Sequence, residues 1–290
     1  MAVELARRIG AEIVSLDSMK VYLEMDIGTA KPSAERRRQV PHHLIDIVSP
    51  DRHFSTGDYL PLLERTIAEI ESRGRRVILC GGTALYLMGF LRGFSALPKA
   101  AWEVRSRLVS EARLEGSQAL HGRLAAVDPQ AAAKLVPGDL RRIVRALEVY
   151  ETTGRPMSEE WNWESAGPRS SAVLFGLSWE RSSLYERTDR RVSGMVDRGL
   201  FEEARRLHDR KPPLSRSARQ CIGYKEIFDG WHEGSGLEEM IERIQRNTRR
   251  FVKRQMTWFR KLPITWLPAD GGARPEDLAA EMDRRASTGS

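Results

Sequence analysis

The sequence has few cysteines and no long apolar run. Its two cysteines, Cys80 and Cys221, lie far apart and outside any metal-ligand spacing, which argues against a disulfide framework or a zinc site. No apolar run of about 18 residues occurs, and the N-terminus lacks a basic start followed by an apolar core. We therefore expect a cytoplasmic protein that neither spans a membrane nor carries a signal peptide.

A glycine-rich phosphate loop is also missing. The pattern G-x-x-x-x-G-K-[ST] does not occur among the 290 residues. The chain starts with MAVELARRIG, which is typical of the end of a helix, because Arg7 and Arg8 suit a helix C-terminus and Gly10 can cap it. In a parallel α/β protein that handles phosphate, a strand and such a loop should lead into this helix. We expect that this segment either precedes the recorded residues or is absent.

Positive charge is in modest excess. Lys and Arg number 47 against 40 Asp and Glu, which gives a net charge of +7 and an isoelectric point near 9.6. This balance favours a polyanionic partner, nucleic acid or a phosphorylated metabolite, although an ordinary basic protein can have the same composition. Hydrophobic residues make up 41% of the chain, so a real core is expected rather than global disorder.

Alternating strand and helix patterns predict an α/β core. Apolar runs at 11–16, 76–80 and 171–178 are typical of buried strands, and helical patterns occupy 58–73 and the residues after Thr83. This order implies a parallel sheet with helices on both faces, which the chain rejoins at 171–178.

The middle of the chain has a different pattern. Helix follows helix from about residue 99 to 160, with breaks that contain Pro or Gly and with no strand candidate. We interpret this stretch as an all-helical insertion at 99–169, between the two halves of an α/β core at 1–98 and 170–290. Further helices are expected near two ranges, 181–209 and 236–261.

Polar residues follow two of the predicted strands. Asp17 and Ser18 end the first, and Gly81-Gly82-Thr83 end the second at the start of a helix. Ligands of open parallel sheets bind at the carboxyl ends of strands, where glycines let an anion approach backbone amides. Taken singly, Asp17 fits an N-cap or a turn, and Thr83 fits a capping residue. Together, in a basic protein, they predict a phosphate-handling site.

The adjacent histidines His42 and His43 are weaker candidates. No partner ligand lies at a suitable spacing, and adjacent residues do not share a helix face. We expect loop packing or substrate contact here rather than metal binding or acid–base catalysis.

Several runs along the chain share their residues with one protein family. They are DSM with VY (17–22), MDIGTAKP (25–32), VPHHLID (40–46), GGT with LY (81–86), RRI with RALEVY (141–150), CIGYK (221–225) and RQMTWFR (254–260). They cover nearly the whole chain in one order. On these residues the chain resembles the tRNA dimethylallyltransferases, also called tRNA isopentenyl-pyrophosphate transferases.

The resemblance implies both a reaction and a fold. The family transfers a dimethylallyl group from dimethylallyl diphosphate to the exocyclic N6 amine of the adenosine just 3′ of the anticodon. Its core resembles the P-loop kinases, and a helical insertion grips the anticodon stem. By resemblance, Asp17 is the base that takes the amine proton and Thr83 a donor near the diphosphate, while Ser18 and Lys31 are substrate ligands. Mg²⁺ is expected to bridge the diphosphate oxygens, with no metal site of protein ligands alone.

The resemblance also implies contacts with tRNA. They are expected at Asp17, Ser18, Met19, Lys20, Thr83, Arg105, Arg141, Arg142, Ile143, Val144, Arg145, Gln220, Cys221, Ile222, Gly223, Tyr224 and Lys225. The family often has Gln where Arg141 stands and Arg where Lys225 stands. Lys225 keeps the charge but lacks the planar fork of arginine, so a bidentate contact there is not expected.

The predicted helix near 236–261 is strongly basic, with eight Lys and Arg against three Glu. We expect its basic side to face RNA, and Trp258 and Phe259 to pack in the core, because a helix must bury one face. The tail after Asp270, rich in Gly, Ala and Arg, is expected to be loose at its end.

Two functions from different classes stay open at this point. One is an active transferase, and the other is a truncated, catalytically impaired protein that holds tRNA and transfers nothing. A small-molecule kinase or an adenylate prenyltransferase fits less well, because a small nucleotide needs neither the arginine-rich insertion nor the CIGYK segment. A monomer is expected.

Overall fold

The computed structural model describes residues 1–93, 98, 100–160 and 172–288. The chain forms two compact units, Met1–Leu87 with Ser171–Ser290, and Met88–Ser170. The second unit therefore starts before the predicted insertion boundary at residue 99 and ends one residue after the predicted boundary at 169. No helix among the described residues is both long and apolar enough to cross a bilayer.

The first unit contains a three-stranded parallel sheet. Its strands are β1 (Ala11–Leu16), β2 (His42–His43) and β3 (Arg76–Gly81), in the order β2-β1-β3. Every residue of the central strand β1 is buried, as expected for a strand with neighbours on both sides. The register pairs Leu16 with Gly81, so β1 and β3 end side by side. The predicted α/β class with a parallel sheet is confirmed.

Strand β3 is less buried than predicted. Val77, Ile78 and Leu79 are only half-buried, and Cys80 is exposed. The reason is its place in the sheet, because β3 is an edge strand and pairs only with β1 among the described residues.

A second, separate sheet holds the later strands. β4 (Phe175–Ser178) pairs in parallel with β5 (Thr265–Pro268) rather than with the first sheet. The prediction that 171–178 rejoins the first sheet is therefore wrong for the residues that the structure describes, and residue 171 lies outside them. β5 was not predicted at all, because its four residues follow a turn and show no clear alternation.

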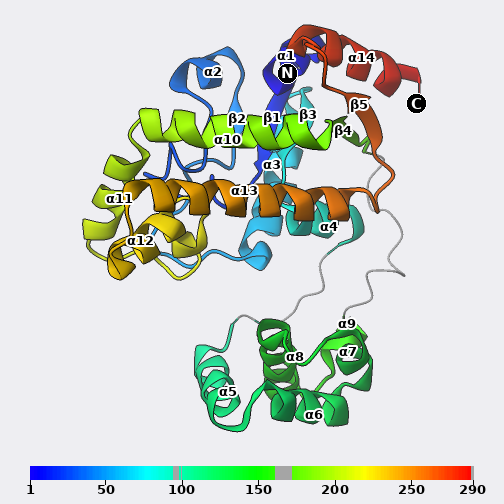
Figure 1. The fold of residues 1–290 in the computed structure, drawn as a ribbon. Helices are drawn as coiled ribbons and strands as arrows, with labels where there is room; N and C mark the ends of the chain where they lie inside the picture. The colour runs from blue at the N-terminus through cyan, green and yellow to red at the C-terminus, as the bar shows by residue number, and fades with distance from the viewer. Residues whose placement is uncertain (94–97, 99, 161–171, 289–290) are drawn as a thin grey trace. The chain divides into compact units, whose positions relative to one another are not determined.

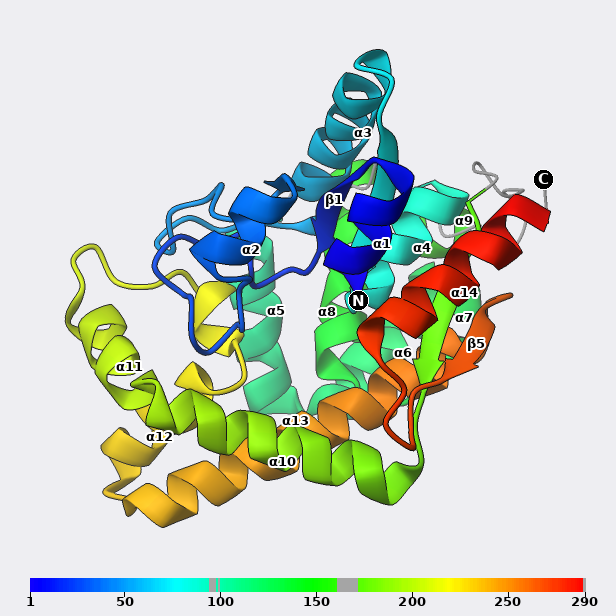
Figure 2. The ribbon, with the colours of Figure 1, turned by 90° about the horizontal axis from the view of Figure 1, so that it is seen from above.

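The two ends of the first unit pack against each other. α1 (Ala2–Ile9) ends at Gly10 and lies along α14 (Pro275–Thr288), with Arg8 Nε 2.7 Å from Asp283 Oδ2 (Figures 1 and 2). The tail after Asp270 consists mainly of this helix, which buries Ala279 and Met282, whereas the predicted looseness concerned only its end. The last two residues lie outside the described part.

Helices α2 to α4 follow one another with the strands of the first sheet, and α3 packs against it, as α1 does. α2 (Ala34–Gln39) precedes β2, α3 (Thr56–Ser72) lies between β2 and β3, and α4 (Ala84–Arg92) follows β3. α3 begins with a capping box in which Ser55 and Asp58 satisfy each other's backbone amides. Its apolar face buries Tyr59, Leu63 and Ile70 against the sheet.

The C-terminal half of the chain forms a second group of helices in the first unit. It comprises α10 (Arg181–Asp197), α11 (Leu200–Asp209), the 3₁₀ turn η1 (Ala218–Gln220), α12 (Tyr224–Glu233) and α13 (Leu237–Phe259). α10 and α13 run side by side, tied by Arg249 Nη1 and Asp189 Oδ2 at 2.7 Å (Figure 2). The predicted helical region 181–209 is divided at Gly199 into two helices.

Only helices occur among the described residues of the second unit. They are α5 (Trp102–Glu115), α6 (Ser117–Val127), α7 (Pro129–Lys134), α8 (Leu140–Thr153) and α9 (Met157–Glu160). Leu108, Leu120, Leu124, Ile143 and Leu147 form the centre of its own core. The helical character predicted for this stretch is confirmed where the structure describes it.

Candidate active site

The two predicted polar strand ends meet at one edge of the first sheet. Asp17 and Ser18 follow β1, and Thr83 follows β3, because the register brings Leu16 beside Gly81. The Ser18 backbone amide donates to Thr83 Oγ1 at 3.0 Å, and the two hydroxyl oxygens lie 3.4 Å apart. An acid and two hydroxyl groups are thereby fixed together.

The Asp17 carboxylate is held by one oxygen only. Its Oδ1 accepts from the backbone amides of Met19 at 2.9 Å and Lys20 at 3.3 Å. Its Oδ2 lies 3.9 Å from Lys20 Nζ, beyond hydrogen-bond distance, and 30% of the side chain is exposed. The backbone therefore sets the orientation of the carboxylate, and Oδ2 makes no hydrogen bond among the described residues.

The sequence suggested that the backbone amides of Gly81-Gly82-Thr83 bind an anion. In the structure, two of these amides already have an acceptor. The amides of Gly82 and Thr83 both donate to the Leu16 carbonyl, at 3.2 and 3.1 Å. A Cβ at 82 would lie 2.1 Å from Gln255 Nε2, the end of a flexible side chain that donates to the Gly82 carbonyl at 2.8 Å, so glycine lets Gln255 lie here without shifting. The glycine permits close approach of α13, and Thr83 contributes its side chain rather than its amide.

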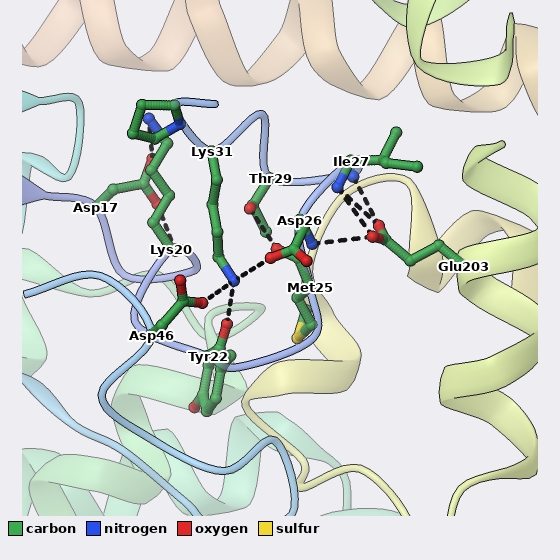
Figure 3. A network of polar contacts seen from close by, with 12 residues as sticks. Asp17, Lys20, Tyr22, Met25, Asp26, Ile27, Thr29, Lys31, Asp46 and Glu203 are labelled. Atoms are coloured by element: carbon green, nitrogen blue, oxygen red, sulfur yellow. Dashed lines mark hydrogen bonds and ion pairs between the residues drawn. The ribbon is translucent and has the colours of Figure 1, made fainter. Parts of the chain in front are cut away.

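Lys31 has a different role from the predicted one. Its side chain is 2% exposed, and its ammonium donates to the Tyr22 carbonyl at 2.6 Å, to Asp26 at 2.7 Å and to Asp46 (Figure 3). These three acceptors use all three donors of a lysine, so none is left for a diphosphate. Burial disfavours the Asp46 anion, but the hydrogen bonds from Lys31 and Arg37 outweigh burial and lower the pKa of this carboxyl below its ordinary value of 3.8.

A group of arginines near Asp17 escaped the sequence analysis. Arg187, Arg190 and Arg191 of α10 line one pocket. Arg191 is exposed as a residue, but nearby protein atoms desolvate its guanidinium and lower its pKa. The negative charge of Asp17 acts in the opposite direction and raises this pKa. Arg190 and Arg191 have no acidic partner within 4 Å in the described part of the chain. The sequence signal for this group was three arginines within five residues. This signal is weak, because exposed helix surfaces often carry such charge.

The predicted tRNA contacts on α8 divide into two kinds. Arg141 and Arg142 are exposed, whereas Ile143 and Val144 are buried in the core of the second unit, so their side chains cannot reach RNA. Arg145 faces inward, with Nη1 2.8 Å from the fully buried Glu148.

Arg105 of α5 also binds this buried acid. Its Nε lies 2.7 Å from Glu148 Oε2, which is 2.8 Å from Arg145 Nη1. The Ala101 amide donates to the other oxygen at 2.6 Å. Arg105 and Arg145 are therefore first of all internal partners of Glu148, each with about a quarter of its side chain exposed, at 27% and 25%.

The Gln220–Lys225 stretch, which contains CIGYK, also includes both accessible and buried residues. Gln220 is exposed and Ile222 and Lys225 are half-buried, whereas Cys221, Gly223 and Tyr224 are buried. Burial also raises the pKa of the Cys221 thiol well above its ordinary value. Lys225 Nζ pairs with Asp229 at 2.5 Å. Only the Gln220, Ile222 and Lys225 side chains can meet a partner without rearrangement.

Helix α13 differs from the prediction at one aromatic residue. Trp258 is 47% exposed and so is not part of the core, although Lys261 Nζ lies 5.4 Å from its ring centre. Phe259 is half-buried. The exposed side also carries Arg250, Lys253 and Arg254.

The two adjacent histidines make packing contacts. His42 Nδ1 lies 2.7 Å from the Val40 carbonyl, and burial lowers the pKa of its ring. His43 Nε2 lies 2.6 Å from Glu12 Oε2, which also accepts from Arg73 at 2.8 Å. Among the described residues, no three His, Cys, Asp or Glu side chains gather in a way that could hold a metal ion.

An acid and hydroxyl groups at the carboxyl ends of neighbouring parallel strands occupy the place where α/β proteins bind their ligands. The family model for IPP transferase matches residues 20–262. The tRNA dimethylallyltransferase of Geobacter metallireducens is 48% identical over 273 residues, which cover 93% of this chain and 88% of that protein. The Bacillus subtilis tRNA dimethylallyltransferase is 41% identical over 268 residues, covering 92% and 85%.

Solved structures agree with these relatives. The full-length tRNA isopentenylpyrophosphate transferase of Bacillus halodurans has a TM-score of 0.72 at 39% identity, covering 99% of this chain and 90% of that chain. A eukaryotic dimethylallyltransferase solved while acting on tRNA has a TM-score of 0.83 at 26% identity, covering 99% and 74%. The chain belongs to the tRNA dimethylallyltransferase family of prenyltransferases, which confirms the resemblance.

Proposed function

We propose that the protein transfers a dimethylallyl group from dimethylallyl diphosphate to the exocyclic N6 amine of the adenosine 3′-adjacent to the anticodon, releasing diphosphate. Membership of the family supports the reaction class. The observation that carries the proposal is the Asp17 carboxylate, with Oδ1 fixed by two amides and Oδ2 without a hydrogen bond, directly before Ser18, whose amide binds Thr83 Oγ1.

The amine needs a base because its lone pair is delocalised into the adenine ring. As the N6–carbon bond forms, Asp17 Oδ2 takes one amine proton, and the bond between the allyl carbon and the diphosphate oxygen breaks. The adenine must leave the base stack to reach this carboxylate. Met19 and Lys20, which follow Asp17 and are half-buried, are placed to contact the extruded nucleotide.

The departing diphosphate needs fixed positive charge and hydrogen-bond donors. Arg187, Arg190 and Arg191 supply the charge from α10, in place of the lysine that the sequence had suggested. The Thr83 hydroxyl accepts from the Ser18 amide at 3.0 Å and donates to Ser18 Oγ only over a long 3.4 Å contact, which its proton can exchange for the leaving oxygen.

Magnesium fits this site as an ion carried by the diphosphate. Mg²⁺ keeps several waters and needs only one or two protein oxygens besides substrate phosphates. The hydroxyl oxygens of Ser18 and Thr83, 3.4 Å apart, are suitable oxygen donors. Bound there, the ion would neutralise charge on the diphosphate.

For the tRNA, side chains that are at least partly exposed are the best candidates, although Arg142 also pairs with Asp139 at 3.3 Å and Lys225 with Asp229. The exposed Arg141 and Arg142 of the insertion are proposed to bind the anticodon stem, and Gln220 with Lys225 a second part of the RNA. We propose a monomer as the working unit. A tRNA substrate and two free cysteines, Cys80 and Cys221, are consistent with work in the cytoplasm.

The test is transfer of labelled dimethylallyl from its diphosphate to an unmodified tRNA transcript, with a filter-binding measurement beside it. Label at the predicted adenosine supports the proposal, and a transcript with guanosine at that position should stay unlabelled. Tight tRNA binding without any transfer would favour the alternative of a binding protein. Absence of both would overturn the tRNA assignment.

A further inference from the structure

A buried carboxylate clamps the MDIG segment. Glu203 of α11 is 2% exposed, and its two oxygens accept from the backbone amides of Asp26 at 3.1 Å, Ile27 at 2.9 and 3.0 Å and Gly28 at 3.1 Å (Figure 3). None of the described basic side chains forms an ion pair with it. Amides alone therefore compensate most of its charge.

Three successive amides that converge on one point form an anion-binding nest. Such a nest would suit a phosphate, and the small residues of this loop would permit one to approach. Here the protein's own carboxylate fills it, from a residue far away in the sequence. The MDIG segment is thus a docking point for α11 rather than a site for the diphosphate.

Tyr224 makes the clamp three-sided. Its hydroxyl donates to Glu203 Oε1 and accepts from the Gly28 amide at 3.1 Å. A Cβ on Gly28 would lie 2.5 Å from the Tyr224 ring, so only glycine allows this approach. Burial and the neighbouring Glu203 raise the pKa of the Tyr224 hydroxyl, which stays protonated and able to donate.

A continuous chain of contacts leads from this clamp to Asp17. The Asp26 carboxylate binds Lys31 Nζ at 2.7 Å, and Lys31 also binds Asp46. The Asp46 amide then donates to the Lys20 carbonyl at 3.1 Å. Lys20 in turn gives its own amide to Asp17 Oδ1 at 3.3 Å. Figure 3 shows Asp17 and Glu203 at opposite ends of this network.

We propose that Glu203 is a positioning residue for the transfer reaction, acting through this network to orient the Asp17 carboxylate. Tyr224 belongs to the Gln220–Lys225 stretch, so the clamp also joins a candidate tRNA-contacting segment to the catalytic acid. The inference rests on the proposed function for its catalytic part. Its structural part, control of the loop that holds Asp17, can be measured without turnover.

The first measurement is amide hydrogen exchange in wild type, Glu203→Gln, Tyr224→Phe and the control Glu202→Gln. Glu202 is the exposed neighbour on the same helix. A glutamine at 203 turns an NH₂ group toward backbone donors, which should open the nest. We expect faster exchange at 26–28 and also at Met19 and Lys20 in the first two variants. Faster exchange at 26–28 alone would overturn the relay to Asp17.

The second measurement is steady-state transfer. Glu203→Gln and Tyr224→Phe should lower kcat about tenfold or more, while the KM for dimethylallyl diphosphate stays unchanged, because that substrate does not touch the clamp. Wild-type rates in both variants, or an equal loss in Glu202→Gln, would overturn the proposal. A wild type that transfers nothing would refute the proposed function instead, and the exchange data would still decide the relay. Circular dichroism checks that each variant is folded. If Glu203→Gln unfolds, Tyr224→Phe alone tests the clamp.

Discussion

The Ser18 backbone amide donates to Thr83 Oγ1 at 3.0 Å, across 65 positions of sequence. This bond joins the ends of two neighbouring parallel strands, and it fixes the hydroxyl of Thr83 at the backbone of the residue that follows Asp17. Both groups follow the last paired residues of their strands, Leu16 and Gly81. The relative positions of these two strand ends are therefore set by sheet register, and the proposed transfer needs its catalytic groups fixed in this way.

Replacing Asp17 tests the general base. Asp17→Asn keeps the size of the side chain and can still accept from the Met19 amide through its carbonyl oxygen, but it cannot take a proton. We expect prenyl transfer to fall about a hundredfold to ten-thousandfold, with tRNA affinity changed little. Rates are read by label transfer and affinity by filter binding. Equal losses in rate and affinity would remove the base role.

Replacing Arg191 tests the proposed diphosphate site. Arg191→Ala should raise the KM for dimethylallyl diphosphate about tenfold or more, because a charge-assisted contact is lost. Arg181→Ala, on the same helix with its guanidinium over Tyr185, is the matched control and should leave KM unchanged. If tRNA affinity rather than the diphosphate KM changes in Arg191→Ala, this pocket binds RNA instead.

Two neighbouring arginines of α8 should behave differently. Arg141→Ala is expected to weaken tRNA binding and to flatten its salt dependence by about one unit, as for one lost phosphate contact. Arg145→Ala should instead destabilise the protein by roughly 1–3 kcal/mol, because Glu148 loses a hydrogen-bond partner in the core. Salt titrations and urea unfolding distinguish these effects. A pure binding defect in Arg145→Ala would contradict the internal role.

Acid should weaken the fold through Asp46. Its pKa is lowered in the folded state, so the stability that it contributes is fully present above its ordinary value of 3.8 and is lost as the pH falls through the folded value. The free energy of unfolding of wild type should exceed that of Asp46→Asn at neutral pH, and the difference should shrink well below pH 3.8. A difference that does not change with pH would mean that the Lys31 contact contributes no charge effect.

The strand-end residues could be predicted from sequence for a physical reason. Parallel strands end at a common edge, so Asp17 and Thr83 follow from two apolar runs and their breaks. The strand Ala11–Leu16 was also recognisable, because a central strand is buried on both faces and most of its residues are apolar, Glu12 and Ser15 excepted.

Other parts of the site could not be read in this way. The partners of Lys31, Asp17 and the MDIG amides depend on contacts that the local pattern does not encode, such as Glu203, 175 to 177 positions away from the amides that it binds. The incomplete burial of β3 and the exposure of Trp258 depend on which elements pack beside them. Hydrophobic periodicity does not report these neighbours. The family resemblance supplied the roles of residues, but it did not separate exposed Arg141 from Arg145, whose guanidinium binds a buried acid.

The basic side of α13 provides the last test. Arg254 is exposed and has no acidic partner within 4 Å among the described residues, whereas Arg243 of the same helix pairs with Glu233 at 2.5 Å and Glu239 at 2.6 Å. If this face meets RNA, Arg254→Ala should weaken tRNA binding and reduce its salt slope by about one unit, while Arg243→Ala should do neither. Trp258→Ala would then lower affinity with an unchanged salt slope, because stacking on a base releases no counterions. Equal affinities in Arg254→Ala and wild type at low salt would show that the charge of α13 serves solubility.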